Sequence, residues 1–199
     1  MKKVLCILAL ILFVTACGGG NDVPKYNYVR IIMETGEEIV IRLYHEHAPV
    51  TVENFIDLVE RNFYDGSEFH RVIEGFMIQG GISANGEMAD TIVGEFASNG
   101  IENSLRHERG VISMARTMMS RDSASSQFFI MHESNRGLDG EYAAFGRVVI
   151  GMEVVDRIAT VEVAPNPAMG GEPGPIEPER IRTMELLENI PEERQTRES

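Results

Sequence analysis

The sequence is poor in the residues that reinforce small folds covalently. Of its 199 residues only two are cysteines. Cys6 lies inside an N-terminal apolar run and Cys17 lies just after it, so neither is predicted to form a disulfide within the folded body. A chain of this length can bury a core large enough to fold without one. We therefore expect a single domain held together by its core.

Basic residues are scarce as well. The chain has 18 Lys and Arg against 31 Asp and Glu, and its formal net charge is −13. Nucleic-acid phosphates and anionic lipid headgroups repel a surface of that sign. The composition therefore predicts no nucleic-acid partner and no electrostatic attachment to a membrane surface.

The apolar run at residues 4–14 is too short to cross a bilayer. It follows Lys2 and Lys3 and ends in small residues, which is typical of a secretory signal peptide. We therefore predict that residues 1–16 are a signal peptide.

The residues Val14-Thr15-Ala16-Cys17 resemble the lipobox of bacterial lipoproteins, in which the cysteine becomes the lipidated N-terminus. The alternative is an ordinary signal peptide with a chance cysteine near its cleavage site. The glycines that follow suit a flexible tether. We expect residues 17–26 to be the lipidated N-terminus and tether, with lipid at Cys17. The protein would then be extracytoplasmic, and its lipid would anchor it to the bacterial cell membrane.

The body begins with alternating apolar residues on both sides of a turn at residues 35–37, which predicts a β-hairpin over residues 28–44. Pro49 then precedes apolar residues at helical spacing, so a helix is predicted to end near Asn62. Short apolar runs at residues 110–115, 127–131 and 144–150 predict buried strands.

Gly151 precedes a second helical pattern built on Met152, Val155 and Ile158. Residues 165–178 hold five of the eight prolines and are predicted to be a loop. Residues 180–187 are predicted to be a closing strand. Many short strands with two helices favour a mainly β fold, a closed barrel, over a doubly wound sheet.

Several short motifs together resemble the cyclophilins. They are Ala48-Pro49-Val50-Thr51-Val52-Glu53-Asn54-Phe55, Phe63-Tyr64-Asp65-Gly66, Phe69-His70-Arg71-Val72-Ile73, Gly75-Phe76-Met77-Ile78-Gln79-Gly80-Gly81, Ser113-Met114-Ala115, Ser126-Gln127-Phe128-Phe129-Ile130, and Leu138-Asp139-Gly140 followed by Phe145-Gly146. Any one of them is weak evidence, but their order and spacing are specific. The resemblance covers about residues 28–158.

The resemblance implies a closed eight-stranded antiparallel β-barrel capped by two α-helices. We place this cyclophilin-like domain at residues 27–188, followed by a disordered polar tail at residues 189–199. It also implies a peptidyl-prolyl cis-trans isomerase that acts on X-Pro bonds of exported proteins and assists their folding. Proline-containing peptides and unfolded proteins would be its partners, and we expect a monomer.

By motif, the resemblance makes Arg71 the catalytic donor and Gln79 the residue that orients it. The proline pocket would be walled by Phe76, Met77, Phe129 and Leu138. Residues flanking the proline would be bound by Gln127 and by the backbone around Ala115 and Arg116, with Tyr142 at the far wall. Many eukaryotic members carry Asn and His where this chain has Arg116 and Tyr142.

These side chains suit the chemistry of prolyl isomerisation. Rotation about a peptide bond faces a barrier of roughly 18–20 kcal/mol because conjugation is lost. In the twisted state the nitrogen regains a lone pair, which a fixed N–H donor can stabilise. No bond breaks, so the reaction requires neither a cofactor nor a metal.

Other interpretations exist for the same residues. An arginine on a strand is usually solvated, and Phe76, Met77 and Phe129 could be barrel core. A proline-peptide-binding holdase with little catalysis is the alternative function, although it would not need the Arg71 and Gln79 pair. A metal site at residues 45–47, His-Glu-His, lacks further ligands at suitable spacing.

Overall fold

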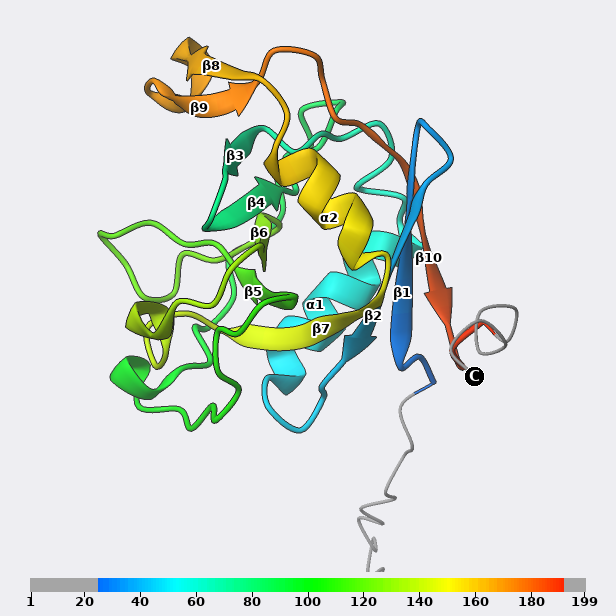
Figure 1. Cartoon of the computed structure of the whole chain (residues 1–199). Helices are drawn as coiled ribbons and strands as arrows, with labels where there is room; N and C mark the ends of the chain where they lie inside the picture. Colours follow the sequence, from blue (N-terminus) through cyan, green and yellow to red (C-terminus); the bar gives the residue numbers. More distant parts are fainter. Residues whose placement is uncertain (1–24, 192–199) are drawn as a thin grey trace, which may run out of the picture.

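The computed structural model describes residues 25–191 (Figure 1). The predicted signal peptide, the lipidation site at Cys17, most of the tether and most of the polar tail lie outside this range. Within it, neither α-helix is long and apolar enough to cross a membrane.

Eight antiparallel strands form the main sheet. In spatial order they are β10 (Ile181–Leu187), β1 (Tyr28–Met33), β2 (Glu38–Leu43), β7 (Ala144–Ile150), β5 (Val111–Met114), β6 (Phe128–Met131), β4 (Met77–Gly80) and β3 (Arg71–Ile73). The predicted N-terminal hairpin is confirmed as β1 and β2, and the predicted closing strand is β10, which pairs with β1.

The prediction of a closed barrel was wrong, because the sheet is an open half-barrel. Its edge strands β3 and β10 form no ladder with each other. The segment before β3 instead meets the start of β10 at one isolated bridge, Glu68 with Arg180, and at backbone hydrogen bonds such as Ile181 N–H to the Ser67 carbonyl at 2.7 Å. β3 has only three residues, and the segment packed beside it belongs to a separate hairpin.

That separate hairpin replaces the loop predicted at residues 165–178. It consists of β8 (Val163–Asn166), the 3₁₀ turn η3 (Pro167–Met169) and β9 (Glu172–Pro175). Proline cannot donate to a ladder, but each strand of a two-stranded ribbon needs only half of its N–H groups for pairing. Pro165 and Pro173 face each other in this ribbon, which lies beside β3 in Figure 1.

The two predicted helices are present. α1 (Pro49–Glu60) buries Val52, Phe55 and Leu58, and α2 (Met152–Ala159) buries Val155 and Ile158. Both helices contribute to one large core with the strands. Two other 3₁₀ turns, η1 (Ala97–Asn99) and η2 (Arg136–Leu138), lie in the connections.

The first turn of α1 is satisfied from outside the helix. The buried carboxylate of Glu95 accepts hydrogen bonds from the backbone N–H groups of Val50 at 3.1 Å and Thr51 at 2.7 Å. A carboxylate at this end of a helix pairs N–H groups that have no partner within the helix and complements the helix dipole. This contact fixes the connection after β4 to the helix.

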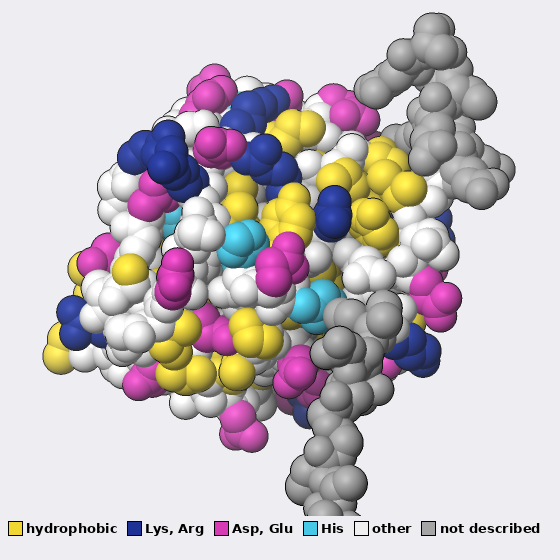
Figure 2. All heavy atoms as spheres, turned by 90° about the horizontal axis from the view of Figure 1, so that it is seen from below, with side chains coloured by type: hydrophobic (Ala, Val, Ile, Leu, Met, Phe, Trp, Pro, Cys, Tyr) yellow, Lys and Arg dark blue, Asp and Glu magenta, His cyan; other side chains and the backbone are white. Residues whose placement is uncertain are grey.

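Charged side chains on the surface are largely interleaved. Arg157 of α2 bonds to Glu37 at 3.0 Å and to Glu179 at 2.7 Å, which ties the helix to the β1–β2 turn and to the segment before β10. On the face drawn in Figure 2, acidic side chains are scattered among the basic ones and the apolar ones. That face presents no continuous basic surface for a phosphate backbone.

The junction between β7 and α2 depends on Gly151. Its φ of +87° is one that L side chains rarely adopt, and a Cβ there would lie 2.1 Å from the Glu38 carbonyl oxygen. Gly36 has the same φ, but a Cβ there would have no neighbouring atom within 4 Å.

We expect Gly36→Ala to lower the free energy of unfolding by about 1 kcal/mol through the backbone alone. Gly151→Ala should lower it by about 3 kcal/mol or more, because the backbone must also shift. Urea titration of both variants measures this, and equal losses would contradict the assigned close approach.

Candidate active site

One register row runs across four strands at one end of the sheet. Arg71 on β3 pairs with Gln79 on β4, Gln79 pairs with Phe129 on β6, and Phe129 pairs with Ser113 on β5. Directly paired residues in antiparallel strands project to the same face. Strand pairing alone therefore brings these four side chains onto one face, although they are far apart in the sequence.

The adjacent row projects to the other face. It consists of Val72, Ile78, Ile130 and Ile112, all of which belong to the large core. The first row lies against a second, smaller apolar cluster that contains Met77 and Phe129. The two-residue period of the strands thus separates a core face from what we call the pocket face.

The pocket face carries a pocket of about 350 Å³. It is lined by Arg71, Phe76, Met77, Gln79, Ala115, Arg116, Met118, Phe129, Leu138, Tyr142 and Glu172. Nine of the ten predicted substrate-site residues are in this lining. The tenth, Gln127, lies beside it and accepts a hydrogen bond from the Gln79 amide at 3.1 Å. The structure thus brings the predicted residues together, while their individual roles remain predictions.

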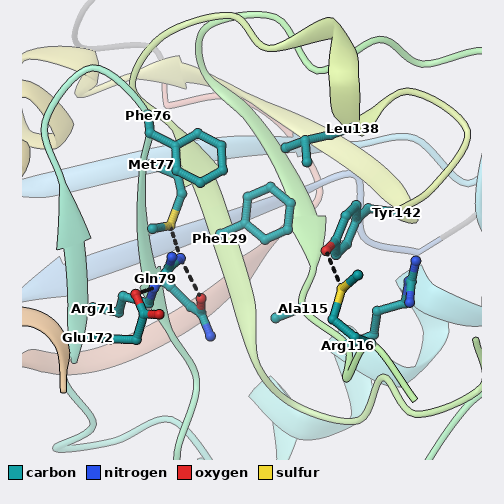
Figure 3. Close-up of a pocket in the computed structure, with 11 residues that line it drawn as sticks. Arg71, Phe76, Met77, Gln79, Ala115, Arg116, Phe129, Leu138, Tyr142 and Glu172 are labelled. Atoms are coloured by element: carbon teal, nitrogen blue, oxygen red, sulfur yellow. Dashed lines mark hydrogen bonds and ion pairs between the residues drawn. The ribbon is translucent and has the colours of Figure 1, made fainter. Parts of the chain in front are cut away.

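The pocket has a polar side and an apolar side (Figure 3). Arg71 and Gln79 lie on the polar side, and the Phe129 ring stands at the centre, facing Leu138 and Tyr142. Met77 and Phe129 are almost fully buried, while Phe76, Leu138 and Tyr142 are partly exposed. A pocket with buried apolar side chains at its base and partly exposed ones at its edge can accept a small apolar ring from solvent.

The Arg71 guanidinium is held by three neighbours. Its Nε donates to Glu172 Oε2 at 2.7 Å, and its Nη1 lies 3.5 Å from Gln79 Oε1 and 3.6 Å from Met77 Sδ. Among the described residues, no hydrogen bond involves Nη2. The predicted contact with Gln79 is present, but it is at the outer limit of hydrogen-bond length.

Glu172 and Met118 line the pocket without having been predicted. Glu172 lies on β9, inside the segment predicted to be a loop, and no motif marks it. Met118 lies between two of the recognised motifs and accepts a weak contact from the Tyr142 hydroxyl at 3.9 Å. Nothing in the sequence indicated either one, because both lie in segments outside the recognised motifs.

A buried histidine supports the apolar wall from below. The ring of His107 stacks on Phe129 with centroids 6.0 Å apart. Its Nδ1 lies 3.2 Å from Asp139 Oδ1 and its Nε2 lies 3.1 Å from Ser113 Oγ. With Asp139 accepting from Nδ1–H, Nε2 accepts from the serine hydroxyl.

This Ser-His-Asp arrangement is not a hydrolytic site. Ser113 and His107 are both 0% exposed, so no substrate carbonyl can reach the hydroxyl. Burial lowers the pKa of His107, opposed by Asp139, and a neutral ring fits both hydrogen bonds. The network fixes the position of Phe129, and sequence reasoning missed the part that His107 plays in it.

Arg116 is largely used up by internal contacts. It donates from Nε to the Glu141 carbonyl at 2.9 Å, and its guanidinium lies 4.8 Å from the Tyr142 ring centroid and 5.2 Å from that of Phe96. Its side chain is only 7% exposed. Arg116 therefore braces Tyr142, and its guanidinium is engaged in contacts within the protein.

His70, next to Arg71, is buried at 5% exposure. Neither ring nitrogen has a hydrogen-bond partner among the described residues. Burial lowers the pKa of His70, opposed by the nearby Glu68 carbonyl and the Gln127 amide, neither of which reaches hydrogen-bond geometry with the ring. Burial and the nearby Arg71 charge both disfavour protonation of His70, so we interpret it as a structural residue.

In residues 25–191 no three His, Cys, Asp or Glu side chains are grouped so that they could hold a metal ion. His45 in the His-Glu-His run contacts the Tyr26 carbonyl with Nε2 at 2.9 Å, and His47 lies 3.4 Å from Ser104 Oγ. The two histidines thus have separate partners within the protein.

The chain is similar to known proteins over nearly all of the described range. Residues 28–186 match the family model of the cyclophilin type peptidyl-prolyl cis-trans isomerases. Peptidyl-prolyl cis-trans isomerase A of Dickeya dadantii is 42% identical over 166 residues, which cover 81% of this chain and 86% of that protein. Peptidyl-prolyl cis-trans isomerase B of Bacillus subtilis is 40% identical over 135 residues, 66% of this chain and 90% of that protein.

The fold is also similar to that of solved structures. A cyclophilin type peptidyl-prolyl cis-trans isomerase of Cryptosporidium parvum, crystallised in the presence of the dipeptide Ala-Pro, matches with a TM-score of 0.65 at 27% identity. The match covers 81% of this chain and 99% of that chain.

The two buried histidines predict how stability depends on pH. The pKa values of His70 and His107 are lowered in the folded state, whereas in the unfolded chain they are near 6.5. Their contribution to the free energy of unfolding is therefore complete above about pH 6.5. It is lost as the pH falls below that value, because the unfolded chain then binds more protons than the folded one. With two such groups, the free energy of unfolding should fall by up to about 2.7 kcal/mol per pH unit.

His70→Leu should roughly halve this slope between about pH 6.5 and 5, since it removes one of the two titrating rings and no hydrogen bond. The carboxylates with lowered pKa values, such as Asp139, titrate below this window. Urea titrations at several pH values measure the slopes. An unchanged slope in His70→Leu would show that this ring is not the group that titrates.

Proposed function

The chain belongs to the cyclophilin type peptidyl-prolyl cis-trans isomerase family, and we propose that it isomerises X-Pro bonds of exported proteins outside the cytoplasm and so assists their folding. It is an enzyme of the peptidyl-prolyl cis-trans isomerase class. The observation that carries the proposed mechanism is the row of Arg71, Gln79 and Phe129, which sets a guanidinium beside an apolar pocket.

The pocket is suited to proline because its centre is a buried aromatic ring with apolar side chains on either side. Phe129 would form the floor, with Phe76, Met77 and Leu138 as walls. When the pocket holds the proline ring in place, the preceding carbonyl remains free to rotate about the prolyl bond. The Cryptosporidium parvum relative was crystallised in the presence of Ala-Pro, which supports a proline-containing peptide as the ligand class.

Arg71 would stabilise the twisted state. In the planar amide the nitrogen lone pair is delocalised, so a donor gains little there. As the bond twists, the lone pair localises and accepts a hydrogen bond from a fixed N–H group. The Nη2 group, which makes no hydrogen bond among the described residues, is the donor left for this purpose.

Gln79 and Gln127 form the second part of the polar side. Gln79 turns its oxygen toward Arg71 and its amide toward Gln127. With Gln79 thus oriented, Gln127 and the backbone of Ala115 and Arg116 would bind the peptide on either side of the proline. No proton is transferred and no bond is broken in this scheme, so it uses no cofactor and no metal.

A second role, holding unfolded chains, has one observation in its favour. Met118 and Met119 beside the pocket are 82% and 96% exposed. Flexible thioether side chains adapt to many peptide sequences. We expect holding to accompany catalysis by a monomer, with proline-containing peptides and unfolded exported proteins as partners.

The proposed location depends on residues outside the described range. Two acyl chains on Cys17 would hold a soluble domain on a bilayer, because each buried methylene contributes about 0.8 kcal/mol. The lipid alone would contact the membrane, since the acidic body would be repelled by anionic headgroups.

The mechanism predicts the effect of removing the guanidinium. Arg71→Ala should lower turnover by about 10²–10³-fold, as does the loss of one preorganised donor elsewhere, while a proline peptide still binds. Arg71→Lys should recover little, because an ammonium lacks the planar arrangement of donors that Glu172 and Gln79 contact. Exchange of a saturating X-Pro peptide, followed by NMR, measures turnover. Near-wild-type exchange by a folded Arg71→Ala protein would refute the role.

Phe129→Ala is the matched control, because it changes the pocket and leaves the donor. It should weaken peptide binding as well as turnover, whereas Arg71→Ala should act on turnover alone. Thermal melting of each variant separates a catalytic defect from unfolding, which matters more for Phe129 because it is buried.

The anchor predicts a change in partitioning. Cys17→Ser should move the protein from the membrane fraction to the soluble fraction without altering the melting temperature of its body, since no described residue is changed. Detergent phase separation and mass spectrometry of the N-terminus measure this. A wild-type protein recovered without lipid from the medium would overturn the anchor.

A further inference from the structure

We propose that Glu172 of the β8–β9 hairpin is a positioning residue for Arg71, and that it sets the plane of the catalytic guanidinium. This inference rests on the proposed function, because it assigns the group that orients the catalytic donor. Glu172 lies on the pocket rim and its carboxylate contacts Arg71 Nε at 2.7 Å, while Gln79 is 3.5 Å from Nη1. The carboxylate is therefore the stronger of the two polar contacts that hold Arg71.

A guanidinium is planar, so two contacts on different nitrogens fix its orientation. Glu172 occupies the Nε–H, and Gln79 and Met77 lie against Nη1 (Figure 3). Nη2 is the nitrogen that makes no hydrogen bond among the described residues. With the plane fixed in this way, the two N–H bonds of Nη2 are held ready for the substrate.

The chain brings Glu172 to Arg71 through a close backbone approach. β9 lies beside β3, and a Cβ added to Gly174 would lie 2.7 Å from the His70 carbonyl oxygen. Only glycine fits so near to that backbone without a shift. Glu172 lies two residues earlier on the same strand, and its carboxylate reaches Arg71, the residue that follows His70.

The exposure of the pair sets the size of the effect. The Arg71 side chain is 22% exposed and that of Glu172 is 49% exposed, so water screens the attraction and the contact adds little to overall stability. Its consequence is local, because losing the Nε partner lets the arginine sample other rotamers. The fraction of molecules with the donor in place then falls.

Glu172→Gln tests this with little change in shape. We expect kcat to fall about three- to fivefold, with KM nearly unchanged, because orientation matters in the twisted state. The control is Glu177→Gln, which removes the same charge from an exposed acid that forms no hydrogen bond or ion pair with Arg71. Its kcat and the melting temperatures of both variants should match the wild type.

A double-mutant cycle with Arg71→Ala shows whether Glu172 acts through the arginine. In that background Glu172→Gln should cause no further loss. An equal three- to fivefold loss there, or an unchanged kcat in the single variant, would overturn the proposal. An inactive wild type would instead refute the proposed function itself.

Peptides that differ only in the residue before proline separate positioning from direct contact. With Ala, Lys or Glu at that position, Glu172→Gln should reduce kcat by the same factor. A loss confined to the Lys peptide would overturn the positioning role, since Glu172 would then be binding the substrate's cation.

Discussion

The antiparallel register of β3, β4, β6 and β5 is the constraint on which the site depends. It aligns Arg71, Gln79, Phe129 and Ser113 in one row and Val72, Ile78, Ile130 and Ile112 in the next. A slip of one residue in any one strand would turn that strand's member of the first row into the core and its aliphatic member into the pocket. Because burying Arg71 would be far more costly than burying Val72, the hydrophobic core itself selects the register that assembles the site.

The site's preorganisation then comes from a second layer of contacts. His107 links Ser113 to Asp139 and stacks on Phe129, while Arg116 braces Tyr142. The His107 ring is buried and the Arg116 guanidinium is engaged in contacts within the protein, so these two side chains fix the walls of the pocket. A reaction that breaks no bond gains from such rigidity, because stabilising one rotational state requires donors and walls that do not follow the substrate as it turns.

Much of this could be predicted from the sequence, and the physical reasons are local. The hairpin of β1 and β2, the helix after Pro49 and the apolar runs that became β5, β6 and β7 follow from side-chain period and turn residues. The residues of the pocket followed from the resemblance of several short motifs to the cyclophilins. The alternation of apolar and polar side chains along a strand does not show which strand pairs with an edge strand. The closed barrel was therefore predicted, whereas the sheet is an open half-barrel with β9 of the β8–β9 hairpin beside β3.

Glu172 shows why that gap bears on function. Its segment is rich in proline and glycine, so its composition predicts a loop. The segment has no periodic pattern from which the direction of the Glu172 side chain could be predicted. Its place beside Arg71 arises from a non-local packing event, the approach of Gly174 to the His70 carbonyl. Residues on regular strands inherit their neighbours from register, which the sequence pattern encodes, whereas residues on such a hairpin acquire theirs only when the fold is complete. The orienting groups of an active site are therefore harder to predict than its donors when they come from the connections and its donors come from the sheet.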